Sequence, residues 1–116
     1  MLLTINRPKQ MNSITHTMNW QVEALFTWYD EQPSLRAAII TGTGNKAFCA
    51  GSDLIEIESA QKAKLESHDV SKSQPWLHNH PQGGFAGISR RKGKKPILAA
   101  VNGIALGGGF EIVLNR

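Results

Sequence analysis

Only one cysteine, Cys49, occurs in this sequence of 116 residues, so no disulfide can form within the chain. A chain without disulfides favours a reducing compartment, and we expect an intracellular protein, with cytoplasm, mitochondrion and peroxisome not distinguished. Aromatic residues are also scarce, at 7% of the chain. Trp20, Trp28 and Trp76 form no stacking array with the basic residues, which argues against binding of single-stranded nucleic acid.

Long hydrophobic runs are missing as well. The most apolar window, residues 97–114, contains Gly103 and Gly107 at GxxxG spacing. A membrane span there would bury Asn102 and Glu111 in lipid at a high cost. The N-terminus lacks the basic segment and apolar core of a signal peptide. We therefore expect no membrane partner.

Motifs for nucleotides and metals are missing too. Residues 42–46 lack the Walker spacing, and residues 103–109 lack the G-x-G-x-x-G spacing of dinucleotide-binding folds. His68, His78 and His80 have no cysteine or carboxylate frame that would complete a metal site, so we expect none. The net charge of +4 favours anionic ligands but is too small to indicate nucleic acid. The basic residues 90–95 could contact phosphates, although a solvated helix end and loop is the plainer interpretation.

What is present is a pattern of alternating strands and helices. Residues 2–6, 37–41 and 97–101 predict strands, and the apolar run 37–41 is typical of a strand buried on both faces. A helix capped by Asn12 or Ser13 is predicted to end near Glu31, with shorter helices over 54–58 and 83–91. The apolar positions of the first helix are Met18, Val22, Leu25, Phe26 and Tyr29. This alternation indicates an α/β fold with parallel strands.

Two parts of this pattern are incomplete. Residues 60–82 are polar and contain Pro75 and Pro81, which predicts a mobile excursion that can include an amphipathic helix. The helix that Gly108 and Glu111 begin is interrupted at Arg116, and a parallel sheet needs cover on both faces. We therefore expect a single domain that is truncated at both ends.

The most informative stretch is residues 101–111, which predicts a buried strand, a glycine turn and the first turn of a helix that carries Glu111. Such a junction presents free backbone N–H groups beside an acid, which suits the stabilisation of an oxyanion. Residues 48–54 form a second candidate for the same task. Cys49, within that segment, is interpreted as a small core residue because no histidine is placed beside it.

Three segments together resemble the enoyl-CoA hydratase/isomerase (crotonase) family. They are residues 6–14, with Asn6-Arg7-Pro8 and Asn12-Ser13-Ile14, then residues 48–54 and residues 95–111. The resemblance implies a crotonase-like ββα spiral, of which residues 1–116 would be the N-terminal part. It also implies an acyl-CoA thioester as ligand, with CoA as the handle of the substrate and no metal or redox cofactor. Family members usually assemble as trimers or hexamers.

The resemblance also implies roles for individual residues. The backbone N–H groups of Ser52 and Gly108 would bind the thioester oxygen, and Glu111 matches one of two catalytic glutamates, whose partner would lie beyond Arg116. Glu111 could equally complement the helix dipole. The substrate path along CoA would include Ala50, Ser52, Asp53, Leu54 and Gly108, with weaker contacts from Met11 and Ser13. For Asp53, a role as helix cap stands as an equal alternative.

Two functions remain open at this point. The first is an enzyme that acts on an acyl-CoA, most plausibly as a 2-enoyl-CoA hydratase or isomerase. The second is a truncated, catalytically inactive chain that at most binds CoA or a full-length partner.

Overall fold

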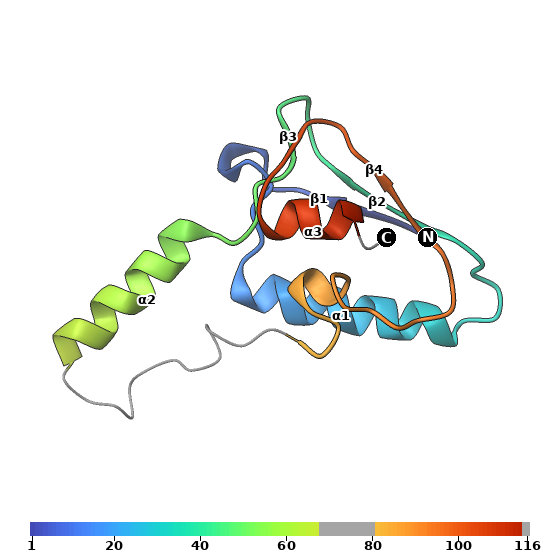
Figure 1. The fold of residues 1–116 in the computed structure, drawn as a ribbon, viewed down its shortest axis with the longest axis horizontal. Helices are drawn as coiled ribbons and strands as arrows, with labels where there is room; N and C mark the ends of the chain where they lie inside the picture. Colours follow the sequence, from blue (N-terminus) through green and yellow to red (C-terminus); the bar gives the residue numbers. More distant parts are fainter. Residues whose placement is uncertain (68–80, 115–116) are drawn as a thin grey trace.

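In the computed structural model, which describes residues 1–67 and 81–114, short strands alternate with helices (Figure 1). The elements are β1 (Leu2–Ile5), the 3-10 turn η1 (Pro8–Gln10), α1 (His16–Glu31), β2 (Ala38–Gly42), β3 (Ala47–Cys49), α2 (Leu54–Ser67), the 3-10 turn η4 (Phe85–Gly87), β4 (Ile97–Ala100), β5 (Ile104–Ala105) and α3 (Gly108–Leu114). None of the described helices is long and apolar enough to cross a membrane.

All the strand pairs are parallel. β2 lies between β1 and β4 in one sheet, and β3 pairs with β5 in a second, smaller one. Helices connect the paired strands, as parallel pairing requires, since the chain must cross back before each new strand. The predicted α/β fold with parallel strands is therefore confirmed.

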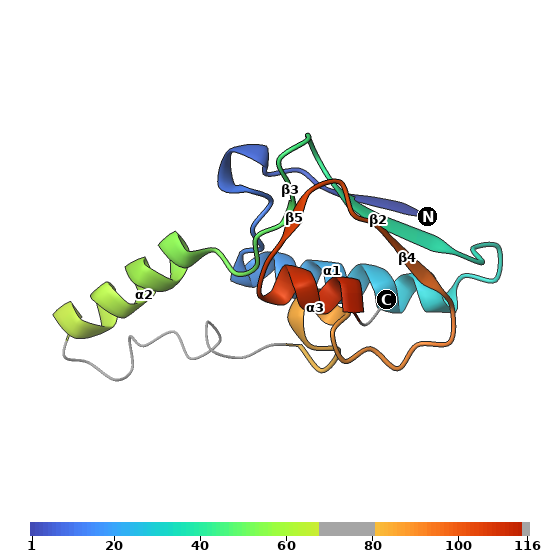
Figure 2. The same cartoon turned by 45° about the horizontal axis from the view of Figure 1, so that its top comes forward.

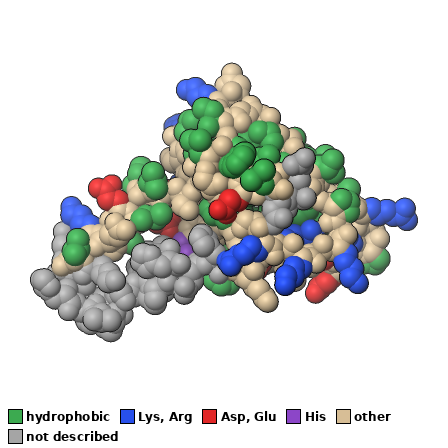
Figure 3. Space-filling model, viewed as in Figure 1, with side chains coloured by type: hydrophobic (Ala, Val, Ile, Leu, Met, Phe, Trp, Pro, Cys, Tyr) green, Lys and Arg blue, Asp and Glu red, His purple; other side chains and the backbone are tan. Residues whose placement is uncertain are grey.

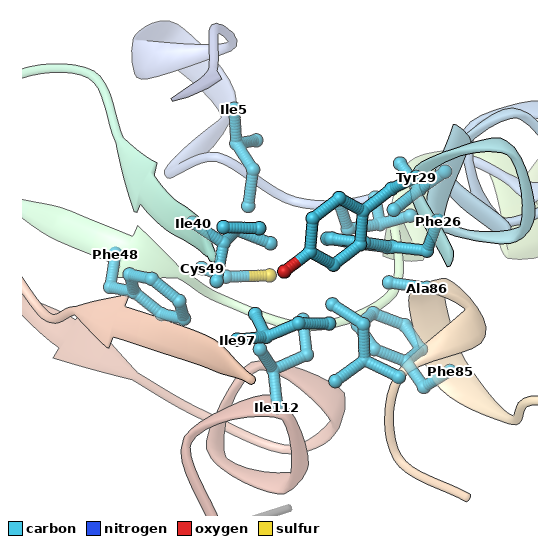
Figure 4. Close-up of a cluster of buried hydrophobic side chains, with 14 residues drawn as sticks. Ile5, Phe26, Tyr29, Ile40, Phe48, Cys49, Phe85, Ala86, Ile97 and Ile112 are labelled. Atoms are coloured by element: carbon cyan, nitrogen blue, oxygen red, sulfur yellow. The ribbon is translucent and has the colours of Figure 1, made fainter. Parts of the chain in front are cut away.

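The hydrophobic core lies between one face of the three-stranded sheet and the helices α1 and α3. Figure 4 shows Ile40 and Ile97 from the sheet pointing toward Phe26 and Tyr29 of α1. The Tyr29 hydroxyl, at the end of a fully buried ring, donates a hydrogen bond of 2.9 Å to the carbonyl oxygen of Pro96. The bond gives this polar atom a partner inside an apolar cluster, which avoids the cost of burying it unpaired.

The other face of the same sheet is not covered by any described residue. Leu2, Ile39 and Leu98 lie in one row across it and are 67%, 42% and 54% exposed. The prediction that residues 37–41 are buried on both faces is therefore wrong for this chain. Ala38 and Ile40 face the core while Ile39 faces outward, because successive side chains of a strand point to opposite sides.

The helix α1 begins later than the sequence pattern predicts. Thr15 is its N-cap, and the Thr15 hydroxyl accepts a hydrogen bond of 3.2 Å from the amide of Met18. Asn12 is instead buried in the preceding loop, where its side chain donates to the carbonyl oxygens of Thr43 and Ala47. Ser13 accepts from the Arg7 guanidinium. Neither predicted cap is free for the helix.

Only part of the predicted apolar face of α1 is buried. Val22, Phe26 and Tyr29 lie in the core, Met18 packs partly against it, and Leu25 is exposed. The face that α1 presents to the sheet is therefore narrower than the predicted one.

The region from 54 to 91 also differs from the prediction. α2 continues to Ser67, so the first part of the predicted excursion is helical, while residues 68–80 lie outside the described residues. The predicted helix over 83–91 is reduced to the short turn η4. Gly84, Ala86 and Gly87 have φ values of 82°, 53° and 65°, which an α-helix does not accept.

Asp53 caps α2. Its Oδ1 accepts hydrogen bonds from the amides of Ile55 and Glu56 at 3.0 and 3.1 Å, and its Oδ2 accepts one from Arg7 at 2.9 Å. Burial raises the pKa of this carboxyl, but the Glu56 amide, the Arg7 guanidinium and the Ile55 amide together outweigh it and hold the pKa below its usual value. Of the two interpretations of Asp53, the cap is the one that the hydrogen bonds show.

α2 extends away from the rest of the molecule in both ribbon views (Figures 1 and 2). Its first turn is nevertheless attached to α1, because the Glu56 carboxylate accepts a hydrogen bond of 3.1 Å from the amide of His16. This bond gives a partner to one of the amides at the start of α1 that have none within the helix, and it holds the first turn of α2 against the first turn of α1.

We predict that replacing Asp53 by alanine lowers the free energy of unfolding by about 1–2 kcal/mol, because the cap and the pair with Arg7 are lost together. The folded-state pKa of Asp53 is lowered, so its contribution is complete above the unfolded value of about 3.9 and is lost as the pH falls through the folded value. Urea unfolding from pH 7 down to about pH 3 should therefore show a shrinking difference between parent and variant. An undiminished difference at low pH would contradict this.

A second prediction concerns the contact between α3 and β3. A Cβ built on Gly109 lies 2.0 Å from the backbone oxygen of Cys49, so Gly109→Ala should destabilise the chain by about 2–3 kcal/mol through overpacking. Gly107→Ala is the control, because nothing lies within 4 Å of the added Cβ and only its φ of +53° is unfavourable, at a cost of about 1 kcal/mol. Urea midpoints of the two variants measure this, and equal losses would show that the close approach is unimportant.

Candidate active site

The pairing of β3 with β5 brings the two predicted glycine turns to the same place. The two strands run in the same direction, and the ladder is extended by a hydrogen bond of 3.0 Å from the amide of Leu106 to the oxygen of Cys49. Both strands end at this bond, and a glycine turn follows each of them. Turns that follow parallel strands lie at one edge of a sheet, so the two turns are neighbours. A Cβ built on Gly51 would lie 3.4 Å from the backbone nitrogen of Gly108.

The first turn leaves the amide of Ser52 without a hydrogen bond among the described residues. The neighbouring amides of Ala50 and Asp53 are both used, since they donate to the oxygens of Met11 and Ile14. Between them Gly51 has a φ of 97°, which breaks the regular alternation of the extended backbone. A buried, left-handed position of this kind favours glycine.

The second turn leaves the amide of Gly108 unpaired in the same way. Gly108 is the first residue of α3, where backbone amides have no partner within the helix. The intrahelical bonds begin with Glu111, whose amide donates to the oxygen of Gly107 at 3.1 Å. A Cβ built on Gly108 would lie 2.5 Å from the Phe85 ring, so this ring packs directly against the turn.

One cleft of about 630 Å³ is lined by residues from both turns. Ser52, Gly108 and Glu111 line it, together with Leu114 from α3 and Phe85, Ser89 and Arg90 from the segment that follows residue 80. The structure thus places the three main residues predicted from sequence around a single space. On the face of the molecule that Figure 3 shows, an acidic side chain lies near the centre, with hydrophobic side chains above it and basic ones below.

Glu111 is exposed in the first turn of α3, three residues after Gly108. Residues at this spacing are neighbours on a helix, and both Glu111 and Gly108 line the cleft. Among the described residues no salt bridge joins Glu111 to a basic side chain.

The residues predicted to line the substrate path fall into two groups. Met11, Ser13 and Ala50 lie near Ser52, because the loop before α1 runs along residues 50–53 and exchanges hydrogen bonds with it, but they do not line the cleft. Leu54 opens α2 and is 75% exposed, outside the cleft. Asp53 belongs to the same segment, residues 50–53. Both of its carboxylate oxygens already accept hydrogen bonds from the protein.

Cys49 is a core residue, as predicted. Its side chain is fully buried, and burial raises the pKa of its thiol despite a hydrogen bond from the Gly51 backbone. A neutral, inaccessible thiol is a poor nucleophile. The histidines considered for a metal, His68, His78 and His80, lie outside the described residues. Within the described part of the chain no three His, Cys, Asp or Glu side chains are grouped for a metal ion.

The sequence pattern did not identify the residues that the segment after residue 80 contributes to the cleft. Phe85 and Arg90 line it, although residues 83–91 were predicted as a helix and residues 90–95 as a solvated end. The signal that could have found them is the run of glycines at 83, 84 and 87, which disfavours a helix and allows a compact loop. Which side of that loop faces the cleft depends on its packing against α1.

Comparison with known proteins agrees with this geometry. A sequence model of the enoyl-CoA hydratase/isomerase family matches residues 1–116. The mevalonyl-coenzyme A hydratases of Beauveria bassiana and Aspergillus fumigatus are 46% and 44% identical over 98% and 99% of this chain, which covers 39% and 38% of theirs. A solved carnitinyl-CoA dehydratase from Mycobacterium avium is 38% identical with a TM-score of 0.77, over 100% of this chain and 41% of that one.

The chain thus spans about two fifths of the length of the relatives that it matches. Within that length both the sequence and the arrangement of strands and helices correspond, and the fold is the crotonase fold. This chain belongs to the enoyl-CoA hydratase/isomerase family.

Proposed function

We propose that this chain binds an acyl-CoA thioester with the thioester oxygen between the backbone N–H groups of Ser52 and Gly108. The observation that supports the proposal is that the amides of Ser52 and Gly108 both lack a partner among the described residues, and that these two residues line one cleft together with Glu111. The Gly108 amide is unpaired because it begins a helix, and a ligand oxygen is one of the groups that can satisfy such an amide.

Two fixed donors at one oxygen suit chemistry in which that oxygen gains charge. Addition of water at the β-carbon of a 2-enoyl thioester, or loss of a proton from the α-carbon, moves electrons onto the thioester oxygen and forms an enolate. Donors that are already in place stabilise the enolate more than the neutral thioester, which lowers the barrier. Because the donors belong to the backbone, the chemistry does not depend on the side chain of Ser52.

Glu111 is proposed to hold and activate the water. Glu111 lines the same cleft as Ser52 and Gly108 and has no ion-pair partner among the described residues, so its carboxylate can accept a proton from water. Water that loses this proton adds to the β-carbon, and the enolate then takes the same proton from Glu111 at the α-carbon, which restores the carboxylate. Glu111 is the acidic residue that lines the cleft in the described part of the chain.

Hydration or dehydration is favoured over isomerisation by the relatives. The two fungal proteins that are 46% and 44% identical are hydratases by name, and the mycobacterial structure is a dehydratase by name. The proposed step uses the two amides, the Glu111 carboxylate and water, with CoA as the handle of the substrate, and no metal or redox cofactor is part of the proposal. Assembly as a trimer or hexamer is part of the same proposal.

Binding without catalysis is the second candidate function. It is favoured because Glu111 is the single acidic residue among the described residues that line the cleft. The family resemblance implies two catalytic glutamates for a hydratase. Binding of a saturated thioester without hydration of an unsaturated one would distinguish it.

We predict that Glu111→Gln lowers the rate of hydration of a short 2-enoyl-CoA by about 10²–10⁴-fold while thioester binding is retained, because glutamine cannot accept the proton. The loss of absorbance of the conjugated thioester measures the rate. Glu58→Gln is the matched control, since Glu58 is exposed on α2 and does not line the cleft. If both variants are as active as the parent, Glu111 is not the base.

The backbone amide of Ser52 can be tested apart from its side chain. Ser52→Ala keeps the N–H group and is expected to retain activity. Ser52→Pro removes the N–H group and is expected to reduce the rate by about 10²–10³-fold, the usual effect of losing one oxyanion donor. Circular dichroism checks that the proline variant is folded. Equal activity of the folded proline variant and the parent would refute the proposed role of this amide.

A further inference from the structure

Arg90 is the basic residue in the cleft wall, and it is unpaired within the described part of the chain. The two other arginines near the core are engaged: Arg7 pairs with Asp53, and Arg91 pairs with Asp30. An arginine normally finds a carboxylate or solvent, and one that lines a cleft without a protein partner is available to a ligand.

The backbone holds Arg90 in this place. Its amide donates a hydrogen bond of 2.7 Å to the oxygen of Gly83, which closes the loop, and the next amide, of Arg91, donates to the oxygen of Ile88. Ile88 is fully buried and Arg91 is tied to α1, so the residues on both sides are fixed. A Cβ built on Gly84 would lie 3.2 Å from Nε of Arg90, which places the start of the guanidinium against the loop.

The cleft is therefore lined by groups of three kinds: backbone amides, apolar side chains and a basic side chain. The unpaired amides of Ser52 and Gly108 line one part, the apolar side chains of Phe85 and Leu114 line another, and the Arg90 guanidinium provides a cation. A thioester held at the amides would lay its alkyl chain along the apolar residues. A group with oxygen acceptors at the far end of that chain could then accept hydrogen bonds from the guanidinium, which presents several N–H donors in one plane.

We propose that Arg90 selects acyl-CoA thioesters whose acyl chain carries an oxygen acceptor, a carboxylate or a hydroxyl, at its distal end. The proposal rests on the proposed function, because it takes the thioester to be anchored at Ser52 and Gly108. Arg90 is a specificity residue in this scheme and takes no part in proton transfer. Glu111 lines the same cleft, so the guanidinium also offsets the repulsion between its carboxylate and an anionic acyl group.

Three saturated thioesters with the same five-carbon chain separate the possibilities. They are pentanoyl-CoA, 5-hydroxypentanoyl-CoA and glutaryl-CoA, which differ only in a terminal methyl, hydroxymethyl or carboxylate group. Isothermal titration of the full chain with each gives the dissociation constants without any turnover. We expect the chain to bind glutaryl-CoA about tenfold more tightly than pentanoyl-CoA, with 5-hydroxypentanoyl-CoA between them, from the strength of a charge-assisted hydrogen bond at a partly exposed site.

The variants identify the residue responsible. Arg90→Gln is expected to abolish the preference and leave the affinity for pentanoyl-CoA unchanged, whereas Lys92→Gln, which removes a nearby exposed charge outside this cleft, should retain the preference. Arg90 is exposed and its side chain makes no hydrogen bond to a described residue, so Arg90→Gln should unfold at the same temperature as the parent.

The other outcomes overturn the inference in recognisable ways. Equal binding of the three thioesters to the parent chain overturns it and leaves the proposed function intact. An equal loss of affinity for all three in Arg90→Gln assigns the guanidinium to the phosphates of CoA instead of the acyl group. Failure of the parent to bind even pentanoyl-CoA overturns the proposed function itself, and this inference with it.

Discussion

The parallel pairing of β3 with β5 is the constraint on which the candidate site depends. The strands are only three and two residues long, and they are separated by more than fifty residues of sequence. The hydrogen bond from the amide of Leu106 to the oxygen of Cys49 is the last one between the two strands, and a glycine turn follows directly after each strand. Were the two strands out of register, Ser52 and Gly108 would not line one cleft.

Several other features of the fold serve to hold this pairing in place. Asn12 and Asn102 come from different loops, yet both donate to the oxygen of Ala47 at the start of β3. Each also binds a carbonyl oxygen in the turn that precedes β3, Thr43 for Asn12 and Gly44 for Asn102. On the other side, Gly109 lies so close to Cys49 that no side chain fits between them. The short strands are thus fixed by side-chain amides and by close backbone packing.

The backbone groups and the side chains of the cleft should respond differently to amino-acid substitution. The oxyanion donors proposed here are backbone groups, so they depend on glycine geometry and on the strand register instead of side-chain identity. Glu111 and Arg90, in contrast, are exposed side chains that form no salt bridge among the described residues, and their replacement should leave stability unaffected. In this proposal the anchor for the thioester is part of the fold and the reacting groups are not, so one fold could support different reactions.

The α/β class, the parallel strands and the buried positions of Cys49 and Phe48 could be predicted from the sequence, because periodicity and glycine-rich motifs are local signals. The same motifs singled out Ser52, Gly108 and Glu111, which line one cleft and whose proposed roles stay predictions. The helix cap, the exposed row of Leu2, Ile39 and Leu98, and the loop that replaced the predicted helix over 83–91 were decided by tertiary structure. Asn12 could cap a helix, but a buried site with acceptors at Thr43 and Ala47 engaged its side chain instead. The position of Arg90 in the cleft likewise follows from packing between segments that are distant in sequence, which no local pattern records.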